Sequence, residues 1–152
     1  MIDRAWIGFT SKPRAAVVEA GQLKFFALAT GETNPIYFDI DAAKAAGHRA
    51  LLAPPTFVFC LASSAPPLDI RLADMGIDTR HILHAEQSFR HHSAIWAGDT
   101  ITFTTRIADI WDKKGGALEF IAQETEALNQ NGEICAHSRS VLVVRHPLGV
   151  VR

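Results

Sequence analysis

The chain has 152 residues, the usual size of one compact domain, so we expect residues 1–152 to fold as a single unit. Hydrophobic residues make up 48% of the sequence and charged residues 20%, so a core can form without disulfides or metal ions. The formal net charge of −1 gives no electrostatic reason to expect nucleic acid or an anionic membrane as a partner.

The N-terminal part of the chain carries short helical signals separated by Gly, Asn and Pro. Leu23, Phe26 and Ala27 recur at helical spacing, and Gly31 marks the end of that helix. The pattern predicts, in chain order, a strand over 15–19, a helix over 21–30, a turn over 31–35, and a short helix that ends at Gly47 and has Asp39 and Asp41 as N-cap candidates.

Residues 56–65 are predicted to form a helix that is apolar on nearly all of its faces. Pro55 is well placed at its start, because the missing N–H would have no partner in the first helical turn. Pro66 and Pro67 end the helix. A helix that is apolar all round must be buried on most faces, so we expect the rest of the chain to cover it.

The C-terminal half is predicted to form long antiparallel strands. Apolar and polar residues alternate between positions 100 and 111, which indicates a strand with one buried face. Asn131-Gly132 is a strong hairpin signal, and Lys114-Gly115-Gly116 indicates a second turn. The predicted strands are 82–91, 100–111, 118–128 and 134–145. One face of such a sheet needs a cover, and the apolar helix is available, so the pattern predicts an α+β fold.

Cysteine usage and the N-terminus predict a cytoplasmic protein. Cys60 and Cys135 show no Cys/His spacing typical of zinc, so we expect two buried free thiols and no metal site. The first residues contain no long apolar run, and no stretch approaches about 18 uninterrupted apolar residues. Neither a signal peptide nor a transmembrane helix is therefore expected.

The segment around the first predicted turn resembles the hydratase motif of the MaoC-like family. Residues 25–39 read FFALATGETNPIYFD, and the motif reads roughly F-A-x-x-[ST]-G-D-x-N-P-[LI]-H-x-D. The matching positions are Phe26, Ala27, Thr30, Gly31, Asn34, Pro35, Ile36 and Asp39. Two further stretches match, which are Ala97-Gly98-Asp99-Thr100 before a strand and Ala53-Pro54-Pro55-Thr56-Phe57 before the apolar helix. The second stretch is typical of the FAS1-like dehydratase branch. The resemblance covers nearly the whole chain and implies the hot-dog fold, an antiparallel sheet wrapped around a central helix.

The resemblance also implies an activity on acyl thioesters of CoA or acyl-carrier protein. Members of the family add water to a trans-2-enoyl thioester, or remove it from a 3-hydroxyacyl thioester, in dimers of hot-dog units and without a cofactor. An Asp and a His five residues later share the water and its proton. A backbone N–H at a helix N-terminus polarises the thioester carbonyl.

This chain departs from the family motif at three positions. Glu32 stands where the family has Asp, and Tyr37 stands where it has His. A gapless count places Pro55 where the family has the Gly whose N–H contacts the carbonyl. Proline has no N–H, and a phenol is a poor base at neutral pH, although it can donate a proton. The acid/base pair of the family is therefore degenerate in this chain.

Three functions remain open on this basis. In the first, the chain is the acyl-binding subunit of a hydratase and pairs with a second hot-dog chain that carries the intact motif. In the second, it is a self-sufficient homodimeric hydratase that uses Glu32, Tyr37 or His84, because His84 and Glu86 would point to one face of a strand. In the third, it binds an acyl thioester without reacting with it.

Four residues near the motif are candidates for substrate binding: Asn34, Pro55, Thr56 and Phe57. Structural roles compete with this interpretation. Asn34 beside Pro35 is typical of a turn, and Thr56 is a possible cap for the helix that follows. Phe57 belongs by default to the core, although part of the aromatic stripe is able to contact an acyl chain.

Overall fold

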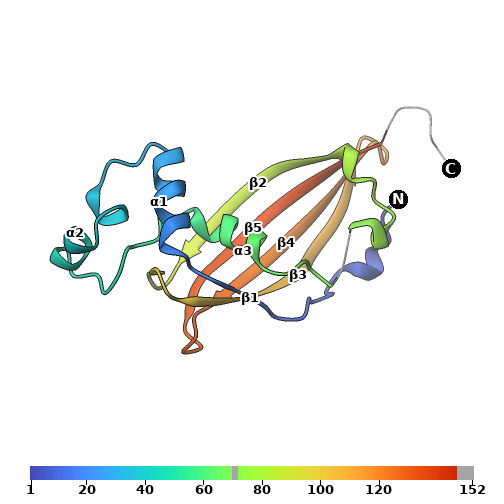
Figure 1. Cartoon of the computed structure of the whole chain (residues 1–152). Helices are drawn as coiled ribbons and strands as arrows, with labels where there is room; N and C mark the ends of the chain where they lie inside the picture. The colour runs from blue at the N-terminus through green and yellow to red at the C-terminus, as the bar shows by residue number, and fades with distance from the viewer. Residues whose placement is uncertain (70–71, 147–152) are drawn as a thin grey trace.

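One antiparallel sheet forms the centre of the computed structural model, which describes residues 1–69 and 72–146 (Figure 1). Its strands are β1 Arg14–Val17, β2 Ile82–His91, β3 Thr100–Lys113, β4 Leu118–Leu128 and β5 Ile134–Arg145. Their order across the sheet is β1-β3-β4-β5-β2, so β1 and β2 form the two edges. The four long strands are confirmed, and the short strand expected over 15–19 lies at 14–17.

The register of the sheet follows from the alternation seen in the sequence. Ile101, Phe103 and Ile107 of β3 point to the buried face, because side chains alternate between the two faces of a strand. On the same face, Thr105 pairs with Thr125 of β4, which in turn pairs with Ser138 of β5. Polar residues therefore interrupt the buried face near the middle of the strands.

Three α-helices lie before β2 in the chain: α1 Ala20–Ala29, α2 Ile40–Ala45 and α3 Phe57–Ser64. Helix α3 packs against one face of the sheet, as expected for the segment 56–65, whereas α1 and α2 lie beyond the end of the sheet (Figure 1). Short 3₁₀ helices that the sequence did not predict are η1 Arg4–Trp6, η2 Pro35–Tyr37, η3 Leu72–Met75 and η4 Thr79–His81. Among the described residues, no helix has the length and apolar character needed to cross a bilayer.

Two apolar clusters fill the face of the sheet that α3 covers. The first lies under α3 and includes Leu23, Phe57, Leu61, Ile101 and Phe103. The second lies toward the other end of the strands, where the N-terminus and the segment around η3 cover the sheet, and it includes Ile2, Met75, Ile77, Ile110 and Ile121. Burial of these side chains is the main favourable contribution to folding.

The expectation that α3 is buried on most faces is wrong for the single chain. Phe57, Val58 and Leu61 are buried, but Phe59 is 42% exposed and Cys60 is exposed. The sheet covers only one side of the helix, so the opposite side of an all-apolar helix faces solvent. The prediction of two buried thiols holds for Cys135 and fails for Cys60.

Asn129 organises the turn between β4 and β5. The Asn131-Gly132 pair predicted the position of this turn but not its type. Its side-chain oxygen accepts hydrogen bonds from the N–H of Asn131 at 2.9 Å and from the N–H of Glu133 at 3.0 Å. Its amide nitrogen donates to the carboxylate of Glu133 at 2.7 Å. The turn spans more than two residues, and of its central residues Gly132 takes the positive φ of 78°.

We expect Asn129→Ala to lower the free energy of unfolding by about 2 kcal/mol, because two backbone donors lose their acceptor at about 1 kcal/mol each. Urea denaturation measures the change. Asn131→Ala is the matched control, since Asn131 is exposed and should change stability by less than about 0.5 kcal/mol. Equal effects of the two substitutions would contradict this role of the Asn129 side chain.

Candidate functional site

The loop that carries the motif begins at a well-defined helix end. Gly31 has a φ of 77°, and its N–H donates to the carbonyl of Leu28 at 3.2 Å. The N–H of Glu32 donates to the carbonyl of Ala27 at 2.9 Å. These two bonds form a Schellman motif, which needs a residue that tolerates the left-handed conformation. The Gly of the motif thus fixes the direction in which the chain leaves α1 and the place of Glu32.

Asn34 and Pro35 then turn the chain back toward Glu32. The side-chain oxygen of Asn34 accepts a hydrogen bond from the N–H of Ile36 at 3.2 Å and caps η2, with Pro35 as its first residue. This turn brings Tyr37 close to Glu32. Burial, followed by the negative charge of Glu32, raises the pKa of Tyr37 above its ordinary value. Tyr37 therefore stays protonated at neutral pH and can donate a proton but cannot act as a base.

Asp39 caps α2, as the sequence predicted. Its carboxylate accepts hydrogen bonds from the N–H of Asp41 at 2.7 Å and of Ala42 at 3.0 Å. These bonds lower the pKa of Asp39, so the carboxylate remains ionised and engaged with the helix. Asp41, the second cap candidate, lies in the first turn of the helix instead.

The start of α3 is where the family presents its oxyanion donor. Pro54 is buried, whereas Pro55 and Thr56 are exposed. Thr56 occupies the N-cap position, but its side chain makes no capping hydrogen bond, so the cap role is not realised. The backbone N–H groups of Thr56 and Val58 have no acceptor among the residues that the structure describes. Pro55 offers no amide, but the helix end still presents two unpaired ones.

Aromatic contacts join α3 to α1 through Phe57 and to β2 through His84. The ring of Phe57 contacts the ring of Phe26 edge to face, with centroids 5.4 Å apart, and this contact joins α1 to α3. His84 stacks on Phe59 with centroids 5.4 Å apart. Phe57 is buried and His84 is exposed.

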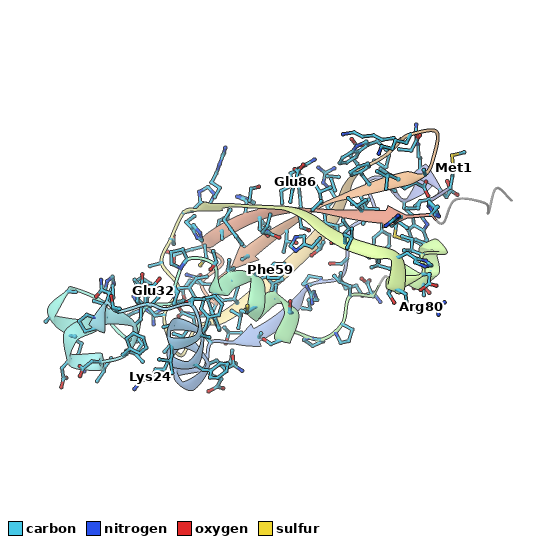
Figure 2. All side chains as sticks on the ribbon, turned by 90° about the horizontal axis from the view of Figure 1, so that it is seen from above. Met1, Lys24, Glu32, Phe59, Arg80 and Glu86 are labelled. Atoms are coloured by element: carbon cyan, nitrogen blue, oxygen red, sulfur yellow. The ribbon has the colours of Figure 1, made fainter. Side chains whose placement is uncertain are left out.

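The expected pairing of His84 with Glu86 on one face of β2 is wrong. The register along β5 shifts between these two residues, because Ala85 is an extra residue opposite the partner strand. The bulge reverses the alternation, so Glu86 points away from the face on which His84 meets Phe59. Figure 2 shows Glu86 on the far side of the β2 ribbon from Phe59.

Within one chain, the candidate catalytic residues form two separate groups. Glu32 and Tyr37 lie together on the loop between α1 and α2, whereas His84 lies on β2 against the outer side of α3. Figure 2 shows Glu32 well apart from Phe59, which His84 contacts. Among the described residues, no group of His, Cys, Asp and Glu side chains is arranged to hold a metal ion.

Asp99 is a polar centre that sequence reasoning treated only as part of a matching stretch. It is 1% exposed, and its carboxylate accepts hydrogen bonds from Arg49, from Gln130 at 3.0 Å and from the N–H of Trp96 at 2.9 Å. The guanidinium of Arg49 also lies over the ring of Trp96. This network ties the segment before α3 to the start of β3 and to the β4–β5 turn. The sequence feature that indicates this buried network is an Asp directly before an apolar strand.

Comparison with known proteins places this architecture among dehydratases. Residues 5–138 match the family described as FAS1-like, dehydratase domain region. A UPF0336 protein of Streptomyces griseus is 33% identical over 146 residues, which is 95% of each chain. A UPF0336 protein of Streptomyces coelicolor is 35% identical over 146 residues, again 95% of each chain.

Solved structures share the fold. The HadBC (3R-hydroxyacyl-ACP dehydratase) complex from Mycobacterium tuberculosis contains a chain that is 26% identical, with a TM-score of 0.75 over 91% of this chain and 96% of that one. A chain of the ChsH1–ChsH2 complex from the same organism is 23% identical, with a TM-score of 0.75 over 92% and 90%. A MaoC-like dehydratase gives a TM-score of 0.79 at 21% identity, over 93% of this chain and 42% of that one. The hot-dog fold predicted from the sequence is confirmed.

Proposed function

Because the chain belongs to the FAS1-like dehydratase domain family, we propose that it is the acyl-binding subunit of an enoyl-thioester hydratase or 3-hydroxyacyl-thioester dehydratase. In this proposal, the acid and base come from a second hot-dog chain with the intact motif, and the thioester belongs to CoA or acyl-carrier protein. The observation that carries the proposal is the Glu32–Tyr37 pair, which offers a protonated phenol where the family motif has imidazole.

The exposed apolar surface supports a partner chain. Among the described residues, strand β2 pairs with β5 alone, so its other edge is open in this part of the chain, and Leu83 on it is 62% exposed. Phe59 and Cys60 of α3 are a second exposed area, on the other face of the sheet from Leu83. An open edge beside exposed apolar side chains is a surface that natural proteins normally cover. The HadBC dehydratase is itself described as a complex, which is consistent with a covering chain of the same fold.

A second candidate function is a self-sufficient homodimeric hydratase. The unpaired N–H groups of Thr56 and Val58 favour it, because they keep potential oxyanion donors at the start of α3 despite Pro55. Glu32 and Tyr37 would then supply the acid chemistry. Both candidates use the same helix end, and they differ in which chain supplies the base.

The test is coexpression with a hot-dog chain that carries the intact G-D-x-N-P-x-H sequence. The two chains should copurify and hydrate crotonyl-CoA, while this chain alone should be nearly inactive. Family-like turnover by the isolated chain would favour the homodimeric alternative. Binding of CoA esters without turnover, alone or in the pair, would instead assign the chain as a non-catalytic acyl-thioester-binding domain.

Assembly should depend on the exposed side of α3. We expect Phe59→Glu to weaken the affinity of the pair at least about tenfold, because a carboxylate at a buried apolar contact costs more than about 1.4 kcal/mol. Sedimentation velocity measures the association. Ile7→Glu is the control, because Ile7 is 40% exposed, close to the 42% of Phe59, but lies after η1 at the other end of the molecule. If Phe59→Glu assembles as well as Ile7→Glu, α3 does not face the partner.

A further inference from the structure

A band of polar side chains crosses the buried face of the sheet between the two apolar clusters. We call it the polar belt, and it consists of Gln87, Thr105, Gln123, Thr125, Ser138 and Ser140. The register explains the band, because Thr105, Thr125 and Ser138 are paired across β3, β4 and β5, and Gln123, Ser140 and Gln87 are paired across β4, β5 and β2. The belt therefore reaches from β3 to the β2 edge.

A cavity of about 280 Å³ separates the polar belt from α3. Phe59, Ala62 and Ser63 of α3 line it on the helix side, and Arg14 of β1 lines it at one end. Phe59 and Ser63 are exposed, so the cavity opens along the outer side of α3, next to β2. This is the same side of α3 that the proposed partner covers.

The polar groups of the belt are not satisfied by one another. The hydroxyls of Thr105 and Thr125 bond each other at 2.9 Å, and the amide nitrogen of Gln87 donates to the carbonyl of Ser88 at 3.3 Å. The side-chain oxygen of Gln87 is buried, and none of the described residues donates a hydrogen bond to it. Burying an acceptor without a hydrogen-bond partner destabilises the fold by about 1–3 kcal/mol. Such a group therefore normally has a partner, either from the protein or from ordered water.

Arg14 lines the cavity from β1, the edge strand opposite to the one that carries Gln87. One terminal nitrogen of its guanidinium donates to the carbonyls of Ala62 at 2.9 Å and Pro66 at 3.0 Å, which holds the end of α3. Its Nε is buried and donates to no acceptor in residues 1–69 and 72–146. Burial also lowers the pKa of this guanidinium. The cavity is thus lined by several hydroxyls and by two side chains, those of Arg14 and Gln87, that each hold a buried polar atom without a partner among the described residues.

An alkyl chain in this cavity would cover the hydroxyls of the polar belt without bonding to them, whereas a ligand hydroxyl both donates and accepts. We propose that the polar belt selects acyl thioesters whose chain carries a hydroxyl group at its far end, remote from the thioester, over thioesters of plain alkyl chains. This inference rests on the proposed function, since it assumes that the acyl chain of the bound thioester enters the cavity under α3.

The experiment compares saturated acyl-CoAs with their ω-hydroxylated counterparts, from butanoyl to decanoyl, by calorimetry on the coexpressed pair. At the chain length that reaches the belt, the hydroxylated ester should bind roughly tenfold more tightly, as expected for one or two added hydrogen bonds. Ser140→Ala and Gln87→Leu should each reduce this preference to about threefold or less. Ser88→Ala is the matched control, because Ser88 lies next to Gln87 on the opposite face of β2 and should retain the preference.

A second readout is independent of the ligand. Gln87→Leu removes an unsatisfied acceptor, so the unliganded variant should melt at a higher temperature than the unmodified chain. A lower melting temperature would show that the Gln87 amide has a structural role and would overturn the inference. Equal or tighter binding of the alkyl ester at every length, or a preference unchanged in Ser140→Ala and Gln87→Leu, would overturn it while leaving the proposed function intact. If no CoA ester binds to the pair, the proposed function itself fails.

Discussion

In the coexpressed pair, the double substitution Glu32→Gln and Tyr37→Phe should leave crotonyl-CoA hydration within about threefold of the unmodified pair. Replacing the motif His of the partner chain with Ala should lower kcat by about 10³- to 10⁴-fold, because a positioned base contributes on that order. Initial rates of hydration for each pair measure the difference. A large loss of rate in the partner variant and a small one in the double variant of this chain would show that the partner supplies the acid and base.

Three features of this chain account for that expectation. Tyr37 stays protonated at neutral pH, because burial and the charge of Glu32 raise its pKa. The extra methylene of Glu32 displaces its carboxylate by about 1.5 Å relative to an Asp, and displacements of about 1 Å can cost 10²-fold in rate. Pro55 supplies no N–H to a thioester oxygen. Under the proposed function, this chain therefore contributes groups that bind the thioester, and the partner chain contributes the base.

The homodimeric alternative makes the opposite prediction. If Glu32→Gln, Tyr37→Phe or His84→Ala alone lowers turnover a hundredfold or more, the chain performs its own chemistry. His84→Ala also tests whether a partner chain brings His84 toward the loop of the opposite protomer. Circular dichroism of each variant confirms that the fold is retained, which matters because His84 stacks on Phe59.

Asp99→Asn should have the second-largest effect, a loss of about 3 kcal/mol in the free energy of unfolding. Removing one partner of a buried ion pair typically costs about 3–5 kcal/mol. We expect the lower end of that range, because the side chain of Arg49 is half exposed and screened by solvent. Urea denaturation at neutral pH measures the loss.

The control is the exposed ion pair between Arg106 and Glu124, whose side chains are 50% and 46% exposed. Glu124→Gln should change stability by less than about 0.5 kcal/mol, because surface pairs contribute little. If the two substitutions have similar effects, Asp99 is not the centre of a stabilising network.

The contribution of Asp99 should also depend on pH. Burial acts to raise its pKa, but the hydrogen bonds from Arg49, from the N–H of Trp96 and from Gln130 outweigh it, so the net pKa is below the ordinary value. A lowered pKa in the folded state means that the stabilisation is fully present above the pKa of the unfolded chain, about 3.9, and is lost as the pH falls through the folded value. The difference in stability between the unmodified chain and Asp99→Asn should therefore shrink below about pH 4. A constant difference from pH 7 to pH 3 would contradict this linkage.

The parts of the fold that were predicted from the sequence are those with a repeating pattern. The alternation in β3 and the turns at Gly115 and Asn131 indicated the hairpins, and the all-apolar run indicated the central helix. The 3₁₀ helices span only three or four residues, which is too short for a periodicity to appear in the sequence. The exposure of Phe59 and Cys60 was missed because an apolar pattern does not tell whether its cover comes from the same chain.

The candidate site was likewise predicted from the sequence only in part. The motif located Glu32 and Tyr37, because the spacing of Gly31, Asn34 and Pro35 encodes the loop. The bulge at Ala85 separated His84 from Glu86, and no residue type in β2 signals it. The polar belt was invisible in the sequence, because its members come from four strands and are brought together only by the register.

The open edge of β2 has a consequence for how the chain must be produced. Without a partner chain on it, the open edge of β2 can pair with any other exposed strand, including β2 of a second copy. The exposed side chain of Leu83 adds an apolar contact to such a pairing. If the chain has the proposed partner, a surplus of the chain over that partner should therefore aggregate or be degraded, whereas balanced synthesis should keep both in solution. Stoichiometric translation would then be a requirement of the fold itself.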